Sequence, residues 1–221
     1  MSEKSKLNVD DAYALKTPAD SVRLYGEWAD TYDKDFVESV GYVVYLRVTE
    51  LLLEQRSLIN GPVLDVGCGT GVVGVSLREG GIDVVDGIDI SPPMLVEAEK
   101  KKTKDGEPVY RKLIAADLTK TLDVADDQYA GLISAGTFTH GHLGPEPLDE
   151  LWRIAAPGAQ CAIGVRTTHF EAADFGAKLA DDVAKGTITE PELVEADLYS
   201  EQSDNPIHAD DKVFVVLCQV V

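Results

Sequence analysis

Short apolar runs alternate with stretches of helical periodicity along most of the chain after residue 60. The apolar runs predict strands near residues 62–66, 83–89, 109–115, 129–135 and 160–167. Apolar positions spaced three and four residues apart predict helices near residues 71–79, 92–104, 147–155 and 170–184. Strands that alternate with helices are typical of a mostly parallel sheet covered by helices on both faces. We therefore expect a doubly wound α/β fold.

The two ends of the chain depart from this alternation. Residues 1–19 show little periodicity and are expected to form a loose arm. Two helices are expected within residues 20–58, the first starting at Asp20 and Ser21, which are good helix caps. Residues 193–200 and 213–221 read as two strands without a crossover helix, so we expect an antiparallel hairpin. We interpret residues 1–221 as one domain with an α/β core over residues 62–221 and seven strands.

A glycine-rich segment joins the first predicted strand to the helix that follows it. Residues 63–71 read Val-Leu-Asp-Val-Gly-Cys-Gly-Thr-Gly. Glycine is needed where φ is positive or where a ligand approaches the backbone, and a helix N-terminus offers free N–H groups. Gly69, Gly71 and Gly74 also spell the dinucleotide fingerprint, and Asp89 ends the next apolar run, where an acid that binds ribose hydroxyls belongs.

Asp65 separates two interpretations of this loop. A dinucleotide presents a pyrophosphate there, which a carboxylate would repel. S-adenosylmethionine has no phosphate and carries an ammonium and a sulfonium group, so an acid near the loop is favourable. Asp65 therefore favours S-adenosylmethionine over NAD as the cofactor, with the carboxylate expected at the mouth of the strand.

At this point the chain resembles the class I S-adenosylmethionine-dependent methyltransferases. Residues 63–71 resemble their first motif, residues 85–95 their second, and Ala115-Ala116-Asp117-Leu118 their third. The family ends in an antiparallel hairpin, whereas the dehydrogenase fold does not. Trp28-Ala29-Asp30-Thr31-Tyr32-Asp33 is similar to a stretch that precedes the first motif in small-molecule members, among them the Williams–Beuren-region methyltransferase-like group. In those proteins the N-terminal helices form a lid, so the resemblance implies that residues 20–58 are lid helices.

The resemblance implies a role for each motif residue. Asp65 would hold the amino group of the methionine part, and Asp89 would bind both ribose hydroxyls. Ile90 and Met94 would pack on the adenine faces, Asp117 would accept from the adenine amino group, and the Leu118 N–H would donate to the ring. The cofactor-binding candidates are Asp65, Gly67, Cys68, Gly69, Gly71, Asp89, Ile90, Met94, Asp117, Leu118 and Ser134.

Some of these residues also have purely structural interpretations. Asp89 could be an ordinary acid at a strand end, Met94 could belong to the core, and Asp117 could cap the turn at Thr119. Tyr32 is expected in the lid, with Tyr42 and Tyr45 in the core.

The acceptor is expected at the end of the fourth strand, because ligands of open α/β sheets bind beyond the carboxyl ends of the strands. His140 and His142 follow this strand, and either imidazole could take a proton from an attacking hydroxyl or amine; one could instead only cap the loop. The catalytic candidates are His140, His142 and Tyr32. Arg166, at the end of the fifth strand, could bind a substrate carboxylate or pair with a nearby acid.

Composition narrows the substrates. The 39 acids and 20 bases give a formal net charge of −19, which would repel nucleic acid. The apolar runs are too short to cross a membrane and residues 1–11 lack a signal-peptide pattern, so we expect a cytoplasmic protein. Cys68, Cys161 and Cys218 show neither metal-ligand nor disulfide spacing, and we expect reduced thiols and no metal site. The oligomeric state is left open.

These observations predict methyl transfer from S-adenosylmethionine to a small-molecule acceptor. Two alternatives stay open: an NAD-linked oxidoreductase, and a cofactor-binding subunit without transfer activity. Asp65 and the terminal hairpin argue against the first, whereas the residues do not decide against the second.

Overall fold

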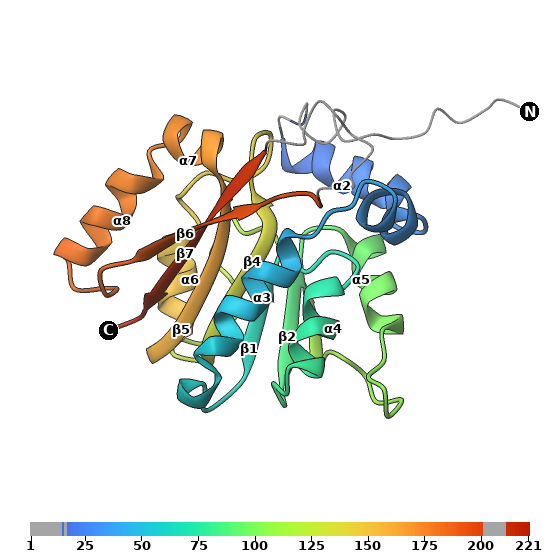
Figure 1. Cartoon of the computed structure of the whole chain (residues 1–221), viewed down its shortest axis with the longest axis horizontal. Helices are drawn as coiled ribbons and strands as arrows, with labels where there is room; N and C mark the ends of the chain where they lie inside the picture. Colours follow the sequence, from blue (N-terminus) through green and yellow to red (C-terminus); the bar gives the residue numbers. More distant parts are fainter. Residues whose placement is uncertain (1–14, 16, 201–210) are drawn as a thin grey trace, which may run out of the picture.

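A seven-stranded sheet in the order β3-β2-β1-β4-β5-β7-β6 forms the centre of the molecule (Figure 1). The computed structural model describes residues 15, 17–200 and 211–221. The strands are β1 (Val63–Val66), β2 (Val85–Asp89), β3 (Lys112–Ala115), β4 (Tyr129–Phe138), β5 (Ala155–Arg166), β6 (Glu192–Asp197) and β7 (Lys212–Gln219). Strands β1 to β5 are parallel, and β7 runs antiparallel to both β5 and β6. The predicted fold class, including the terminal hairpin, is confirmed.

Helices cover both faces of the sheet. One face carries α3 (Val44–Glu54), α4 (Val72–Glu79) and α5 (Pro92–Lys100); the other carries α6 (Leu148–Ile154), α7 (Thr167–Ala172) and α8 (Phe175–Ala184). A short 3-10 turn, η2 (Arg56–Leu58), leads into β1. Side chains of β1 alternate between the two faces: Val63 packs in the α3–α4 cluster, and Leu64 and Val66 pack in the α6–α8 cluster. Asp65 therefore faces the α4 side.

Several element boundaries differ from the sequence predictions. The predicted helix over 170–184 is two helices, because Asp174 adopts a left-handed φ of 55° between them. Strand β5 starts at Ala155, ahead of the strand predicted over 160–167, and includes Pro157 and Gly158. The pairing of β5 with β4 shifts register between Tyr129 and Gly131, which accommodates these two residues.

The first described helix is α2 (Pro18–Trp28). Its N-cap is Thr17, not Asp20 or Ser21 as predicted. Thr17 and Asp20 form a capping box, in which the Asp20 N–H donates to Thr17 Oγ1 (3.2 Å) and the Thr17 N–H donates to Asp20 Oδ2 (3.1 Å). The helix thus starts inside the predicted arm, whose residues 1–14 and 16 lie outside the described residues.

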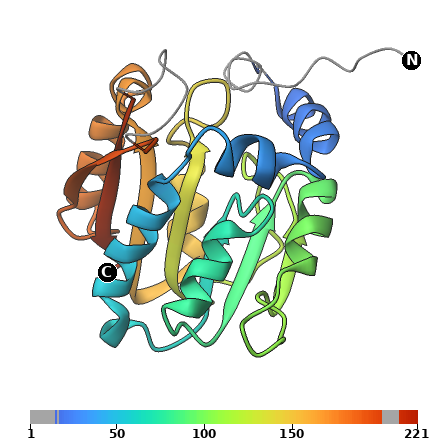
Figure 2. The same ribbon diagram turned by 45° about the vertical axis from the view of Figure 1, so that its right-hand side comes forward.

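A π-helix, η1 (Asp33–Glu38), follows α2. We call residues 18–38, which comprise α2 and η1, the lid. Figure 2 shows these blue segments across one end of the sheet, beside α5. No helix in the described ranges is long and apolar enough to cross a bilayer.

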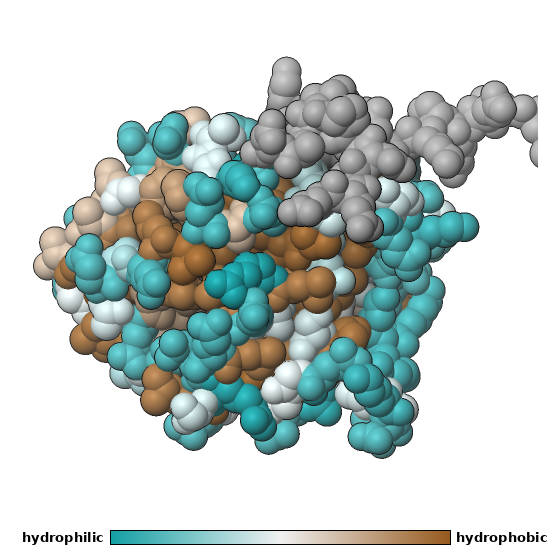
Figure 3. Space-filling view, viewed as in Figure 1, coloured by the Kyte–Doolittle hydropathy of each residue, from teal (hydrophilic) through white to brown (hydrophobic). Residues whose placement is uncertain are grey.

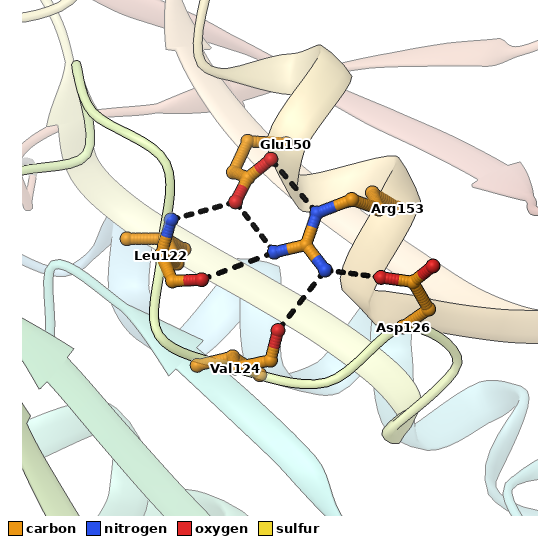
Figure 4. Close-up of polar contacts among 5 residues, drawn as sticks. All are labelled: Leu122, Val124, Asp126, Glu150 and Arg153. Carbon is orange, nitrogen blue, oxygen red and sulfur yellow. Dashed lines mark hydrogen bonds and ion pairs between the residues drawn. The ribbon is translucent and has the colours of Figure 1, made fainter.

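The loop that leads into β4 is held by one arginine of α6 (Figure 4). Arg153 donates to both carboxylate oxygens of Glu150, to the carbonyls of Leu122 (3.2 Å) and Val124 (3.0 Å), and to Asp126. Glu150 Oε1 in turn accepts from the Leu122 N–H (2.6 Å). These bonds satisfy loop carbonyls that no neighbouring strand pairs, and they fix the approach to β4.

The sheet order places a ligand site between β1 and β4. From β1 the chain continues outward to β2 and β3, and β4 then returns to the other side of β1. Loops at the carboxyl ends of β1 and β4 therefore diverge, and they leave a crevice where ligands of such sheets bind.

Candidate functional site

A cavity of about 190 Å³ lies at this switch point, beneath the lid. Thr17, Pro18 and Tyr25 line it from α2 and its cap, and the loops after β1, β2, β3 and β4 supply the rest. Nine residues that the sequence predicted for the site line this cavity together: Tyr32, Gly67, Gly69, Asp89, Ile90, Met94, Asp117, Leu118 and His142.

Gly67 and Gly69 bring bare backbone to the cavity. Both have positive φ, 69° and 51°. A Cβ on Gly67 would lie 1.9 Å from Thr137 Oγ1, so no larger residue fits beside β4. A Cβ on Gly69 would meet no atom within 4 Å, because this glycine borders open space. The loop thus forms a cradle that a ligand can approach closely.

Asp89 is fixed at the end of β2 by two backbone N–H groups. Oδ2 accepts from the Gly69 N–H (2.9 Å) and Oδ1 from the Ser91 N–H (2.8 Å). Burial raises the pKa of this carboxyl, and the hydrogen bonds from the backbone oppose the shift. Each oxygen keeps a further lone pair, so the group can accept from two vicinal hydroxyls, which is the geometry of a ribose.

The larger cavity is also lined by apolar side chains and a second acid. Ile90, Met94 and Leu118 supply the apolar surface. Asp117 Oδ1 caps its turn by accepting from the Thr119 N–H (2.9 Å) and hydroxyl (2.7 Å). The structural interpretation of Asp117 is therefore correct, and the residue also lines the cavity. These residues offer apolar contact and one hydrogen-bond acceptor to a flat polar ring.

Asp65 lies deeper than the sequence analysis expected. It does not line the cavity, and its side chain is fully buried beneath the loop, where Oδ2 accepts from the Tyr110 hydroxyl (2.7 Å). Among the described residues Oδ1 has no hydrogen-bond partner. Burial, opposed by the Tyr110 hydrogen bond, raises the pKa of Asp65 to about 7. The contact of Asp65 with a cofactor amino group stays a prediction.

Four more predicted residues do not line the cavity. The Cys68 thiol faces Gly87 inside the fold, and Gly71 caps α4 with Tyr110 packed against it. The Ser134 hydroxyl donates to the Val66 carbonyl (2.8 Å). The imidazole of His140 bonds instead to Thr168 Oγ1 (2.8 Å). These side chains are occupied by contacts within the protein, which explains their positions.

A second, smaller cavity of about 50 Å³ adjoins the first. Tyr25, Tyr32, Gly136 and His142 line both. Further aromatic walls come from Phe36, Tyr42 and Tyr199. Tyr42 is buried, as predicted for a core residue, and also forms this wall.

Arg166 lines the smaller cavity as well. It pairs with Asp211 Oδ2 at 2.5 Å, so the ion-pair interpretation of this arginine is present in the fold.

His142 sits where the two cavities meet. Its Nδ1 lies 3.1 Å from the His140 carbonyl, which only accepts, so Nδ1 carries the hydrogen. Nε2 then accepts from the Tyr25 hydroxyl at 2.7 Å. Burial lowers the pKa of His142 below its usual 6.5. The imidazole is therefore neutral at pH 7, and the lone pair of its Nε2 is engaged by the hydroxyl of Tyr25, which also lines both cavities.

Sequence reasoning did not single out Tyr25, Gly136 or Thr137. Tyr25 lies in the first predicted helix, where an aromatic ring fits the same apolar pattern whether it packs in a core or over a ligand. The similarity of residues 28–33 to a lid stretch was the available signal. Within the described ranges, no three His, Cys, Asp or Glu side chains gather as a metal-ligand set.

Comparisons with known proteins agree with this geometry. A family model described as a methyltransferase domain matches residues 63–158. Among solved structures, the chain resembles magnesium protoporphyrin IX methyltransferase from Synechocystis PCC 6803 with bound S-adenosylmethionine. The TM-score is 0.58 at 17% identity, over 89% of this chain and 97% of that one. Residues 63–158 are therefore similar to a methyltransferase domain, and the fold of the chain is that of these solved methyltransferases.

Two further similarities extend beyond residues 63–158. An S-adenosylmethionine-dependent methyltransferase from Aquifex aeolicus shares the fold, with a TM-score of 0.60 at 19% identity over 88% of this chain and 98% of that one. Human methyltransferase-like protein 27 is 27% identical over 169 residues. That match spans 73% of this chain and 64% of the human protein, less than two thirds of its length.

Proposed function

We propose that this protein transfers the methyl group of S-adenosylmethionine to a small-molecule acceptor held in the smaller cavity. The observation that carries the proposal is His142, a neutral imidazole that lines both the larger cavity and the aromatic cavity beside it, and whose Nε2 accepts from the Tyr25 hydroxyl. A methyl donor on one side and a nucleophile on the other would meet beside this nitrogen.

The residues of the larger cavity fit S-adenosylmethionine. The cradle over Gly69, the fixed carboxylate of Asp89 and the wall of Ile90, Met94 and Asp117 match a methionine chain, a ribose and an adenine in turn. The unpartnered Oδ1 of Asp65 supports a role for this acid toward the amino group, directly or through water. The bound cofactor supplies an electrophilic methyl group.

The chain's own residues then position and deprotonate the acceptor. Tyr25 and Tyr32 of the lid would exclude water from the junction of the cavities. The acceptor hydroxyl or amine would pass its proton to the Tyr25 oxygen as its bond to the methyl carbon forms, and Tyr25 would pass its own hydroxyl proton to His142 Nε2. Alignment of the nucleophile supplies much of the rate.

The finer assignments belong to the same proposal. Aromatic walls and a volume of about 50 Å³ support a small acceptor. The net charge of −19 disfavours nucleic acid. The 27% identity with methyltransferase-like protein 27 supports placement near the Williams–Beuren-region group. A cytoplasmic location remains a prediction of the sequence.

Calorimetry with S-adenosylhomocysteine tests the cofactor assignment, with NADH as the comparison. We expect micromolar binding of the first ligand alone; binding of NADH alone would favour the oxidoreductase alternative. Incubation with methyl-labelled S-adenosylmethionine and a metabolite extract then tests transfer. A protein that binds the cofactor but labels no product would be the silent subunit.

The base is tested with His142→Gln, and His140→Asn serves as the matched control from the same loop. We expect His142→Gln to lower kcat for the labelled acceptor by about 10²-fold or more while S-adenosylhomocysteine affinity stays within about threefold. In the unchanged enzyme, kcat should rise with pH through a pKa below 6.5, because only neutral His142 accepts a proton. Equal losses in both variants would contradict the assignment.

A further inference from the structure

One carboxylate of the lid contacts the glycine loop without reaching either cavity. Asp33 is the first residue of η1 and directly follows Tyr32, which lines both cavities. Its Oδ1 accepts from the Thr70 hydroxyl at 2.5 Å, and its Oδ2 pairs with Lys101 Nζ. Thr70 lies between Gly69 and Gly71, and Lys101 caps the end of α5. We call Asp33, Thr70 and Lys101 the Asp33 cluster.

The Asp33 cluster joins the lid to the cofactor loop itself. Thr70 is 2% exposed, and its hydroxyl donates to Asp33, whose side chain is 35% exposed. The stem of Lys101 crosses Gly71, with Cγ 3.3 Å from where a Cβ of that glycine would lie. A hydrogen bond to a charged acceptor is stronger than one between neutral groups. The contact therefore resists separation of lid and loop.

The helix that carries Asp33 depends on such support. In η1 the backbone makes wide i→i−5 turns, for example from the Ser39 N–H to the Lys34 carbonyl (3.1 Å). π-helices are rare and occur often at functional sites. Rings on this segment form the cavity walls: Tyr32 packs on Phe36 with centroids 5.0 Å apart and on Tyr25 with centroids 6.1 Å apart. Movement of Asp33 would thus move the walls of both cavities.

We propose that Asp33 is a positioning residue that couples closure of the lid to occupation of the glycine loop. The inference rests on the proposed function, because the loop is assigned to S-adenosylmethionine. No member of the Asp33 cluster lines a cavity, so its effect passes through Tyr32 and the loop backbone. A ligand that orders the loop then favours the closed lid, and by linkage the closed lid tightens that ligand.

The coupling also implies an order in which the cofactor and the acceptor bind. Tyr25, Tyr32 and Phe36 belong to the lid and wall the smaller cavity. That cavity is complete only when the lid is closed. Cofactor binding therefore prepares the acceptor cavity, and the cofactor binds first.

Thr70→Val and Thr70→Ser are a matched pair, because valine keeps the shape of threonine without the hydroxyl and serine keeps the hydroxyl. Asp33→Asn tests the same contact from the lid, and Lys101→Met tests the ion pair with an unaltered loop. The readouts are the affinity for S-adenosylhomocysteine and hydrogen exchange of lid peptides (residues 18–38) with and without this ligand. Thermal melts confirm that each variant folds.

In the unchanged protein we expect S-adenosylhomocysteine to slow exchange of the lid. In Thr70→Val and Asp33→Asn this protection should be lost and affinity should fall by about three- to tenfold. Thr70→Ser should stay within about twofold of the parent, and the double variant Asp33→Asn/Thr70→Val should lose no more than either single variant. Losses that add would indicate two independent structural roles and would overturn the coupling.

Two further outcomes separate this inference from the proposed function. If the unchanged protein binds S-adenosylhomocysteine and its lid exchange does not respond, the coupling is wrong and the cofactor assignment stands. If it binds no S-adenosylhomocysteine, both are wrong.

Discussion

At the scale of single residues, the buried carboxyl of Asp65 makes stability depend on pH. Its pKa is about 7 in the fold, raised chiefly by burial, whereas an unfolded Asp titrates near 4. The folded state therefore keeps a proton that the unfolded chain has lost. The stabilisation from this group is complete below about pH 4 and is lost as the pH rises towards 7.

Asp65→Asn removes this dependence and keeps an oxygen that can accept from Tyr110. We expect the ligand-free variant to melt at the same temperature as the parent near pH 4 and at a higher temperature at pH 8. Each 1 kcal/mol of added stability would raise the melting temperature by about 2–4 °C. Calorimetric melts at the two pH values measure this, with the exposed Asp105→Asn as control. Equal melting temperatures at pH 8 would show that Asp65 is not a strained buried charge.

Residue identity and spacing predicted that Asp89 and Asp117 belong to the site. Both lie at the ends of strands, and the carboxyl ends of these strands meet at one edge of the sheet. The same reasoning could not place Asp65 or choose between the histidines. Tyr110, the partner of Asp65, comes from the loop before β3, and strand alternation gives the face of a side chain but not its neighbour. His140 and His142 flank Gly141, whose φ of 78° turns the loop between them, and a loop has no periodicity from which this is predictable.

At the scale of elements, the network around Arg153 predicts a loss of stability without loss of function. Arg153→Met would leave the Leu122 and Val124 carbonyls and the Glu150 carboxylate without this donor. We expect a cost of about 1–3 kcal/mol, since removing one partner leaves polar groups unsatisfied in a partly buried site. Urea unfolding measures it. S-adenosylhomocysteine affinity should not change, because none of these residues lines either cavity of the candidate site. Weaker binding of S-adenosylhomocysteine would contradict this separation of stability from function.

Most elements could be predicted because their apolar periodicity matches burial on one or both faces of a sheet. The exceptions depend on contacts distant in sequence or on backbone choice. The π-helix at Asp33 is held by Thr70 and Lys101, neither of which a local pattern reveals. The break between α7 and α8 comes from the left-handed backbone of Asp174, a conformation that a non-glycine residue rarely signals.

At the scale of the whole molecule, the net charge of −19 implies repulsion among surface acids. Figure 3 shows hydrophilic side chains over much of the α5 side of the molecule. We expect the melting temperature to rise as salt increases from 0.01 to 0.15 M, since the screening length falls from about 30 to about 8 Å. Sodium and lithium chloride should act alike if screening is the cause. A melting temperature that falls with salt would mean that attractive pairs dominate.

The overall topology was predictable because motif order fixes which strands precede which helices, and the absence of a crossover between the last two strands required an antiparallel pair. The insertion of β7 between β5 and β6 was not, because a hairpin satisfies the same pattern with either strand against β5. The smaller cavity could not be predicted from the sequence either, because its walls come from the lid, β4, β5 and the hairpin.

The hairpin of β6 and β7 contributes to one of the two cavities, so substitutions there affect that cavity separately from the other. Leu198, Tyr199 and Val213, on or beside its strands, line the smaller cavity, whereas no lining residue of the larger cavity in the described ranges comes from β6 or β7. Under the proposed function, replacements at the hairpin would therefore alter which acceptor binds and leave the residues proposed for the methyl donor unchanged. In such a fold, substitutions in the edge strands can change acceptor choice without changes in the central strands.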